Sequence, residues 1–461
     1  MSLDERPWAT RALGIELHHL RSHGDSVELP IDRLIQPGLR RNPKRAHLLV
    51  STVLGKHLPT DPRAVLGAGE RLGDLVRAAL GDRALEVSAS GGFGTGAVVL
   101  GFAETATGLG HTVAARIGAR CYLHSTRRDV PDAETLTRFE EGHSHATTHL
   151  LQPAPADIYL NDLPLVLVDD EISTGATALD AIRALHAFAP RPRYVLASLV
   201  DMREEDDRIR FDAAAADLGV RIDTVCLASG RTGLPDGIVE SVLALPEPAL
   251  NPVADRRGTH ARAKLPWPVA VPEGGRHGIL ASDAAAFDTA IVFAADELHA
   301  RLAVSAPGRP VIVIGHEELM YLPLRLANAL SDYGIPTLFQ TTTRSPAYVL
   351  DEPGYPLRRG FRFTAPESGQ SAPRYLYNAR WPDGEAADPI LVVVLDAPAD
   401  TAELVAEGGL IDVLTASGAD VLTAVLSGAD PRVLHAERGG TVLVPVDDAG
   451  VSARWSPVES S

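Results

Sequence analysis

Cysteine and methionine are scarce in this chain of 461 residues. There are two cysteines, Cys121 and Cys226, and three methionines. Two cysteines cannot form a disulfide framework, which favours a reducing compartment. Residues 1–11 carry mixed charge and no apolar segment, so no signal peptide is predicted. We therefore expect a cytoplasmic location.

Long hydrophobic runs and an excess of positive charge are also missing. No stretch approaches about 18 consecutive apolar residues, so neither a membrane span nor a membrane partner is predicted. The formal net charge is −17, from 60 acidic and 43 basic residues. Non-specific nucleic-acid binding needs a basic surface, so we expect no direct DNA binding. The apolar content of 45% and charged content of 22% are typical of globular proteins.

Apolar runs of strand length alternate with amphipathic stretches of helix length. Strands are predicted at residues 97–100, 120–123, 165–168, 194–200, 222–227, 290–294, 311–314, 336–340, 390–395 and 421–425. Helices are predicted at residues 70–80, 105–117, 178–188, 206–218, 296–305, 319–331 and 401–416. Apolar strands separated by helices are typical of parallel sheets covered on both faces, so the predicted class is α/β.

Proline marks the predicted boundary between two domains. Residues 246–278 are rich in proline and show little apolar periodicity. We predict a first domain over residues 1–248, a proline-rich linker over 249–277, a second α/β domain over 278–450 and a tail over 451–461.

The most informative segment is residues 165–177, which read LVLVDDEISTGAT. Four apolar residues predict a buried strand, and two acids stand at its carboxyl end, where open α/β sheets bind ligands. A hydroxyl-rich loop then opens a helix. Its unpaired N–H groups and hydroxyls suit a phosphate monoester. Asp169 and Asp170 could then accept hydrogen bonds from the vicinal hydroxyls of a ribose.

This segment resembles the loop of type I phosphoribosyltransferases that binds 5-phosphoribosyl 1-diphosphate (PRPP). The resemblance implies that Asp169 and Asp170 are catalytic, bind the ribose hydroxyls and hold Mg²⁺ through water and those hydroxyls. It implies that the 5′-phosphate is bound by Ser173, Thr174, Gly175, Ala176 and Thr177. The alternative is an ordinary strand–turn–helix with a good N-cap. A Walker loop is excluded, because its lysine and glycine spacing are missing.

The resemblance also implies a diphosphate loop after an earlier strand. Residues 97–101 form the predicted strand, and residues 102–106 form a short turn that starts a helix. We expect the backbone N–H groups of Ala103, Glu104 and Thr105 to bind diphosphate, with Lys56 at the same site.

A flexible catalytic loop is expected next in the order that the resemblance implies, and residues 129–149 occupy this position. Arg127 and Arg128 precede it, and arginine suits bidentate contact with phosphate. We predict that both arginines, with His143 and His145, neutralise the diphosphate as the loop closes. Two alternatives remain for the histidines, a metal site and solvated polar residues. The two arginines could equally be ordinary surface residues.

Residues 343–346 read Thr-Arg-Ser-Pro, close to residues 317–323, which read EELMYLP. Upstream, Lys44 and Lys56 are two of only three lysines. The combination resembles an orotate-phosphoribosyltransferase-like subfamily found in tellurite-resistance gene neighbourhoods, whose C-terminal TRSP domain is named for this motif. The resemblance covers roughly residues 35–395. It implies a type I phosphoribosyltransferase fold, a parallel sheet with flanking helices, followed by a second α/β domain. It also implies synthesis of a nucleoside-like metabolite linked to tellurite or stress resistance.

One departure from the family bears on the acceptor. Purine-type transferases carry an acid at the position of Ser173, placed to handle a proton of the base. A serine cannot do this, and orotate-type relatives also lack the acid. We therefore predict a pyrimidine-like or other non-purine acceptor.

The C-terminal half repeats the order of the first half. Residues 98–105 parallel 311–319, residues 123–127 parallel 340–344, and residues 165–170 parallel 391–396. The last match lacks the hydroxyl-rich loop. These matches favour a pseudo-dimer whose second half is a degenerate copy, in which Glu318, Thr343, Arg344 and Ser345 serve the acceptor or cover the first site. The alternative is that any α/β protein repeats strand, loop and helix, and a homodimer also remains open.

We predict a Mg²⁺-dependent enzyme that transfers ribose 5-phosphate from PRPP to a small nitrogenous acceptor and releases diphosphate. The reverse reaction, release of a base by diphosphate, is the alternative within enzymes. A regulator or scaffold that binds PRPP without turnover is the alternative outside them. The C-terminal half could also be a protein-interaction module.

Overall fold

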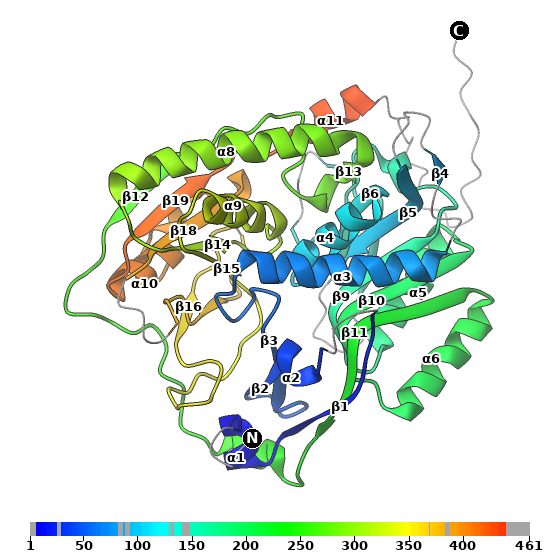
Figure 1. The fold of residues 1–461 in the computed structure, drawn as a ribbon, viewed down its shortest axis with the longest axis horizontal. Coiled ribbons are helices and arrows are strands. Elements are labelled where there is room, and N and C mark those ends of the chain that lie inside the picture. Colours follow the sequence, from blue (N-terminus) through cyan, green and yellow to red (C-terminus); the bar gives the residue numbers. More distant parts are fainter. Residues whose placement is uncertain are drawn as a thin grey trace.

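The computed structural model describes residues 6–24, 29–81, 86–87, 93–128, 130, 133–140, 148–367, 369–382 and 388–438. Two sheets with helices on their faces form the N-terminal and C-terminal halves, and they lie side by side (Figure 1). The predicted α/β class with a second α/β domain is confirmed. Among the helices in these ranges, none is both long and apolar enough to span a membrane.

The first sheet has five parallel strands at its centre. In spatial order its strands are β1 (Glu16–Ser22), β11 (Arg221–Gly233), β10 (Arg193–Asp201), β9 (Leu165–Ile172), β5 (Phe93–Gly101), β6 (Ala119–His124) and β13 (Ile279–Leu280), with β4 (Glu86–Val87) beside β5. The edge strands β1, β13 and β4 are antiparallel. The main helices are α3 (Pro62–Leu80), α4 (Thr107–Ile117), α5 (Ala176–Phe188) and α6 (Glu205–Leu218). The first four residues of β9 are fully buried, as expected for a central parallel strand.

The second sheet is entirely parallel among its described strands. Its order is β12 (His260–Lys264), β19 (Val421–Val425), β18 (Ile390–Leu395), β14 (Val311–Gly315) and β15 (Thr337–Thr341). Its helices are α8 (Ala284–Ser305), α9 (Tyr321–Asp332) and α10 (Leu410–Ala416).

Shorter elements complete the two halves. Three antiparallel pairs are β2 (Ile35–Leu39) with β3 (His47–Ser51), β7 (Thr137–Glu140) with β8 (Thr148–Leu151), and β16 (Gly360–Phe363) with β17 (Arg374–Tyr377). The short helices are α1 (Trp8–Leu13), α2 (Ile31–Leu34), α7 (Ile238–Leu243) and α11 (Pro431–Arg438).

Three sequence predictions differ from this arrangement. Residues 290–294, predicted as a strand, lie in the middle of α8. Val292 and Phe293 are exposed on this helix, so apolar residues occur on all its sides and mimic a strand run. The helix predicted at 401–416 is regular only over its last turns, in α10. Residues 249–277, predicted as a linker, contain β12, which extends the second sheet.

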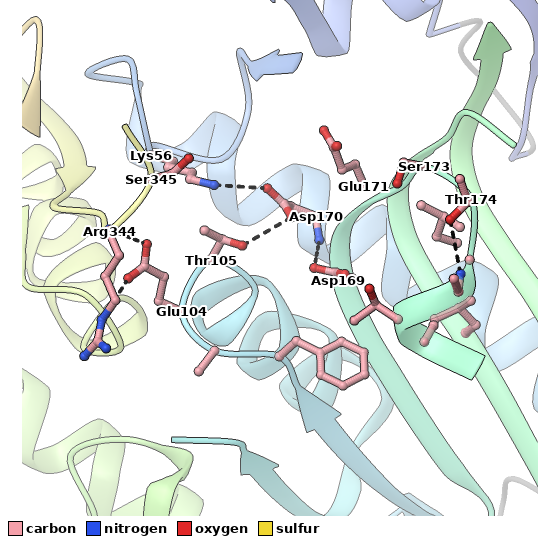
Figure 2. A pocket seen from close by; sticks show the side chains of 18 of the residues that line it. Lys56, Glu104, Thr105, Asp169, Asp170, Glu171, Ser173, Thr174, Arg344 and Ser345 are labelled. Atoms are coloured by element: carbon pink, nitrogen blue, oxygen red, sulfur yellow. Dashed lines mark hydrogen bonds and ion pairs between the residues drawn. The ribbon is translucent and has the colours of Figure 1, made fainter. Parts of the chain in front are cut away.

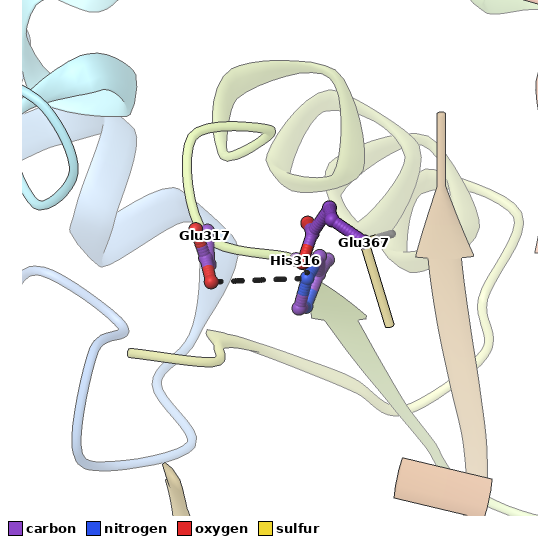
Figure 3. A group of neighbouring side chains, drawn as sticks. All are labelled: His316, Glu317 and Glu367. Atoms are coloured by element: carbon purple, nitrogen blue, oxygen red, sulfur yellow. Dashed lines mark hydrogen bonds and ion pairs between the residues drawn. The ribbon is translucent and has the colours of Figure 1, made fainter. Parts of the chain in front are cut away.

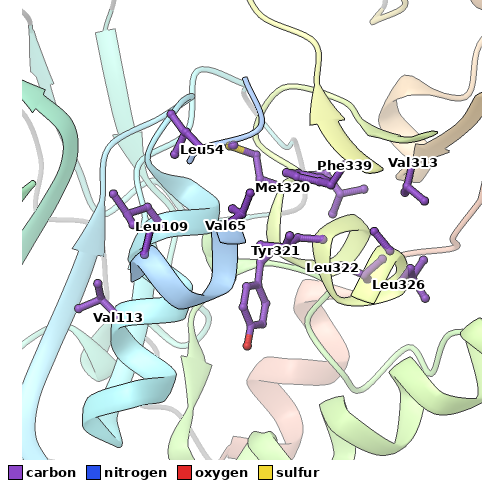
Figure 4. Packing of buried hydrophobic residues seen from close by; sticks show 14 of the residues in the cluster. Leu54, Val65, Leu109, Val113, Val313, Met320, Tyr321, Leu322, Leu326 and Phe339 are labelled. Atoms are coloured by element: carbon purple, nitrogen blue, oxygen red, sulfur yellow. The ribbon is translucent and has the colours of Figure 1, made fainter. Parts of the chain in front are cut away.

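One hydrophobic core runs through both halves. Helices α3 and α4 of the first half pack against α9 of the second half, as Figure 4 shows. The ring of His111 lies 3.7 Å from that of Tyr321, measured between centroids. Gly108 brings α4 close to α9, because a Cβ at this position would lie 2.9 Å from the Cβ of Met320. The two halves therefore share buried surface that neither could cover alone.

This close approach predicts opposite effects of one substitution at two helical glycines. We expect Gly108→Ala to destabilise the protein by about 1–3 kcal/mol, because the new methyl group meets a Cβ that the backbone holds in place. Gly67→Ala in α3 is the control. Nothing lies within 4 Å of its Cβ position, so alanine should stabilise by about 0.5–1 kcal/mol. Urea denaturation measures both, and equal effects would contradict the packing described.

Candidate functional site

A cavity of about 320 Å³ opens at the carboxyl ends of β5 and β9 (Figure 2). Its lining residues are Lys56, Arg127, Leu196, Arg344, Ser345 and residues 102–105 and 169–178. The chain leaves β5 toward β6 on one side, and later returns as β9 on the other side. Such a switch point leaves a crevice between diverging loops, and open α/β sheets bind ligands there.

The loop from β9 to α5 supplies the predicted phosphate site. Ser173, Thr174, Gly175, Ala176 and Thr177 all line the cavity. Gly175 has a φ of 81°, and a Cβ there would lie 3.0 Å from the ring of a neighbouring phenylalanine, so glycine suits this turn. The amino end of α5 carries no acidic residue in its first turn, which favours a bound anion there, and the backbone N–H of Ala176 donates to Thr174 Oγ1 at 3.4 Å.

Asp169 and Asp170 extend β9 into the same cavity. Asp170 accepts a hydrogen bond from Thr105 Oγ1 at 3.2 Å, and Lys56 Nζ lies 3.7 Å from its Oδ2. Burial, and then the charge of Asp170, raise the pKa of Asp169 well above its usual range. Glu171, which the sequence prediction did not include, also lines the cavity and pairs with Arg45 at 2.9 Å.

These two aspartates are the lining residues best suited to hold Mg²⁺. Carboxylate oxygens are the ligands that this ion prefers. Lys56 Nζ lies 3.7 Å from Asp170, and the adjacent Asp169 adds a second carboxylate to the pair. A divalent cation between the carboxylates would relieve their repulsion, so the residues fit the ion.

The predicted diphosphate loop lies opposite, but one of its donors is occupied. The backbone N–H of Ala103 donates to Ser125 Oγ at 3.0 Å. Ser125 Oγ in turn lies 2.7 Å from Nδ1 of the buried His149. Ala103 therefore cannot offer this N–H to a ligand, and Glu104 and Thr105 remain as the candidate donors of the loop.

Residues from the C-terminal half complete the wall of the cavity. Arg344 and Ser345 line it, and Glu104 turns toward them (Figure 2). Glu104 Oε1 accepts hydrogen bonds from Thr343 Oγ1 and, at 2.8 Å, from the backbone N–H of Arg344. The C-terminal half thus holds the predicted diphosphate loop directly.

Arg128 and Glu318 lie away from the cavity, in a buried cluster of charges between the halves. Arg128 Nη1 lies 3.2 Å from Asp396 Oδ1, and its Nη2 lies 2.6 Å from Glu367 Oε1. Glu318 accepts a backbone hydrogen bond at 2.7 Å from Arg127. Burial disfavours its charge, but nearby arginines lower the pKa of Glu318 to about 2. Arg128 was predicted to contact diphosphate; the carboxylates around it hold it here instead.

His143 and His145 lie outside the described residues. Of the predicted flexible loop, residues 130, 133–140 and 148–149 are described, and they form β7 and part of β8 with a short lead-in.

A second group of possible metal ligands belongs to the charge cluster. His316, Glu317 and Glu367 place ligand atoms within 4.8 Å of one another (Figure 3). Arginine side chains already engage both glutamates: Arg344 and Arg374 bind Glu317, and Arg128 binds Glu367. Three guanidinium groups oppose a further cation, so this group is a closed ion-pair network.

Sequence reasoning missed most members of this network. Asp396 was noted only as a strand end, and Arg276, Glu367 and Arg374 were not singled out. They come from separate parts of the chain, and no local pattern distinguishes them from exposed charges. Their burial, with each side chain at most 7% exposed, is the property that sets them apart.

Comparison with known families gives two matches. Residues 34–231 match a family described as phosphoribosyl transferase, and residues 273–414 match the TRSP domain found C-terminal to it. The predicted resemblance to phosphoribosyltransferases with a TRSP domain is confirmed. A search of curated proteins finds no match.

Several solved structures are similar to part of this chain. Adenine phosphoribosyltransferase from Rhodothermus marinus is 19% identical, with a TM-score of 0.28, over 42% of this chain and 94% of that one. The enzyme from Thermoanaerobacter pseudethanolicus is also 19% identical, with a TM-score of 0.27, over 42% and 96%. The enzyme from Trypanosoma brucei, in complex with AMP, pyrophosphate and ribose-5-phosphate, is 15% identical, with a TM-score of 0.25, over 40% and 68%.

Removal of Arg128 should strongly destabilise the protein. Arg128→Met leaves the buried carboxylates of Asp396 and Glu367 short of a countercharge, and we expect a loss of about 3–5 kcal/mol. Arg183→Met is the control, since Arg183 is half exposed and pairs with Asp180 on the surface; it should cost less than about 1 kcal/mol. Chemical denaturation measures both. Similar losses would show that the buried pairs contribute no more than a surface pair.

Acid should weaken the fold in two steps. Burial lowers the pKa of His124 and of His277 to about 4, so the native state binds fewer protons than the unfolded chain below pH 6.5. Stability is then full above pH 6.5 and falls between pH 6.5 and 4. Protonation of Glu318, whose pKa is lowered to about 2, removes further stability between pH 4.5 and 2. Urea denaturation across this pH range tests the sign, and His277→Gln should flatten the first step.

Proposed function

Because this chain belongs to the phosphoribosyl transferase family that carries a C-terminal TRSP domain, we propose that it transfers ribose 5-phosphate from PRPP to a small nitrogenous acceptor and releases diphosphate. One observation carries the proposal. A hydroxyl-rich helix N-terminus, a pair of aspartates and a turn held by the C-terminal half all face a single cavity. These three features match the three parts of the donor, which are its 5′-phosphate, its ribose hydroxyls and its diphosphate.

The chemical step exchanges one bond at C1 of the ribose. The bond from C1 to the diphosphate oxygen breaks, and its electron pair leaves with diphosphate. The lone pair of the acceptor nitrogen forms the new bond to C1, and the nitrogen loses its proton to solvent or a nearby base. Positive charge develops on the ribose as the old bond breaks, so negative groups near C1 lower the barrier.

The residues of the cavity divide this work. Residues 173–177 hold the 5′-phosphate, and this remote contact positions C1 for reaction. Asp169 and Asp170 accept hydrogen bonds from the ribose hydroxyls and favour positive charge at the ring. Lys56 and Arg127 bring positive charge to the cavity wall for the departing diphosphate. The aspartates would also hold Mg²⁺, which when bound neutralises charge on the leaving group.

The acceptor proposed is pyrimidine-like or another non-purine base. Ser173 lines the cavity, and the resemblance of its loop to the family assigns it the position at which purine-type enzymes carry the acid that handles a base proton. A serine hydroxyl neither takes nor supplies a proton readily at neutral pH, so an acceptor that is itself acidic suits the site better. With the resemblance to proteins of tellurite-resistance neighbourhoods, we further propose that the product is a nucleoside-like metabolite of stress resistance.

Titration with PRPP and Mg²⁺ tests the proposal. We expect the wild-type protein to bind PRPP in a calorimeter, and the double variant Asp169→Asn/Asp170→Asn to bind at least about tenfold more weakly, because the ribose hydroxyls and the cation lose their acceptors. Diphosphate release with a panel of pyrimidine-like acceptors should be lost in the same variant. Asp180→Asn, on the exposed part of α5, is the control and should bind as the wild type does. A folded wild-type protein without PRPP binding would overturn the proposal.

A further inference from the structure

The two halves repeat the same order of elements in space. In the first sheet the order β6-β5-β9-β10 is parallel throughout, and in the second sheet β15-β14-β18-β19 is its counterpart. Helix α4 joins β5 to β6 as α9 joins β14 to β15. Helix α5 joins β9 to β10 as α10 joins β18 to β19. A hairpin follows β6 and another follows β15, namely β7–β8 and β16–β17.

Hydrogen bonds recur at the matching positions. The N–H of Ser125 donates at 3.0 Å to the carbonyl of the last β5 residue, and the N–H of Thr342 donates at 3.0 Å to that of the last β14 residue. The N–H of Ala103 donates to the Ser125 hydroxyl at 3.0 Å, and the N–H of Glu317 donates to the Thr342 hydroxyl at 3.0 Å. The same strand order could arise by chance in two unrelated α/β domains. Side-chain hydrogen bonds at equivalent residues of both halves make a chance match far less probable.

The next threonine pairs with the hairpin in both halves. Thr126 exchanges two backbone hydrogen bonds with Leu150, at 2.9 and 2.8 Å. Thr343 exchanges two with Tyr375, also at 2.9 and 2.8 Å. These bridges place the Thr-Arg segments of the two halves in the same backbone setting.

Each half also reaches across to hold the other. Glu104 of the first half accepts hydrogen bonds from Thr343 Oγ1 and from the next N–H in the chain, the latter at 2.8 Å. Glu318 of the second half accepts from Thr126 Oγ1 and from the next N–H, both at 2.7 Å. Both glutamates lie three residues beyond the end of their strand. The exchange is reciprocal, as it is across a two-fold axis.

The segments before the long helices are exchanged in the same way. Thr60, just before α3, pairs with Phe339 on the edge of β15 through bonds of 2.9 and 2.8 Å. Ile279, just before α8, pairs with Tyr122 on the edge of β6. Phe339 pairs with Val313, two residues before the end of β14, and Tyr122 pairs with Val99, two residues before the end of β5. The two aromatic residues therefore occupy equivalent positions in the two sheets. The arm that covers β15 also carries Lys56 into the cavity.

The two switch points differ in what fills them. Val394 pairs with the last residue of β14, and Val168 pairs with the last residue of β5. Asp396 and Asp170 each lie two residues beyond these valines, so they occupy equivalent positions. Around Asp396, Arg128 and Arg276 approach to 3.2 Å and close the space. The counterpart of Arg128 in the other half is Ser345, a small side chain that lines the open cavity. The open site therefore has a serine at the position where the closed site has an arginine.

We propose that the chain is an intramolecular pseudo-dimer in which the C-terminal copy has a closed site and serves the open one, with Thr343 as a positioning residue that holds the diphosphate loop through Glu104. The two-fold-related contact of Thr126 with Glu318 lies in the buried charge cluster between the halves, and we assign it a structural role. This inference rests on the proposed function, because the loop that Thr343 holds is the one assigned to diphosphate.

The two-fold relation supplies a matched pair of variants. Thr343→Val and Thr126→Val each remove one hydroxyl bound to a buried glutamate, and each hydroxyl also accepts the N–H two residues on, at 3.1 Å. Thermal unfolding should show similar losses of stability for the two. PRPP affinity, measured by calorimetry with Mg²⁺, should fall about tenfold for Thr343→Val and stay at the wild-type value for Thr126→Val. Thr343→Ser keeps the hydroxyl and should restore binding.

Equal PRPP affinities of the two valine variants would overturn the positioning role while leaving the proposed function standing. Absence of PRPP binding by the wild-type protein would overturn both. Ser345→Arg provides a second test if Thr343→Val does not fold, because this position is half-buried at the rim of the cavity. This substitution gives the open site the arginine that Arg128 supplies at the closed site. PRPP affinity should therefore fall more than tenfold. Unchanged binding in this variant would contradict the proposed equivalence of the two sites.

Discussion

The buried ion pairs between the halves are the constraint on which the rest of the molecule depends. Arg128 leaves the first sheet and enters an acidic pocket of the second, where Asp396, Glu367 and Glu317 surround it. Burying such charges is costly, and the cost is offset only while every partner stays in place. The halves are thus fixed in one relative position, and that position decides which side chains reach the open cavity.

A continuous apolar core reinforces this arrangement. The helices α3, α4 and α9 bury one another's surfaces, so that separating the halves would expose hydrophobic area on both sides. Non-directional apolar contact supplies most of the free energy, whereas the ion pairs and the glutamate–threonine contacts specify the register. Two enzyme subunits commonly meet by such a mixture of interactions, and here one chain provides both sides.

The arrangement also explains why one site is open and the other closed. In the second half the acid at the switch point is neutralised by two arginines, and no hydroxyl-rich loop follows it. In the first half Lys56 approaches Asp170 only to 3.7 Å, and the hydroxyl-rich loop around Gly175 lines the cavity. The second half has a closed site and supports the open site of the first half. Its Thr-Arg-Ser-Pro segment is the part that contacts the cavity.

By itself, the sequence determined the local parts of the site. Residues 165–177 specify a buried strand, two acids and a hydroxyl-rich turn within one contiguous segment, because an apolar run, a glycine and N-terminal hydroxyls act over a few residues. Residues 290–294 of the helix over residues 284–305 were predicted as a strand, because apolar residues on every side of the helix obscure the helical period of its sequence. Only the tertiary structure brought Thr343 to Glu104, 239 positions away, and turned Arg128 from a candidate ligand-binding residue into an anchor between halves. Such contacts depend on how two sheets pack, and ionic partners leave no period or spacing in the sequence.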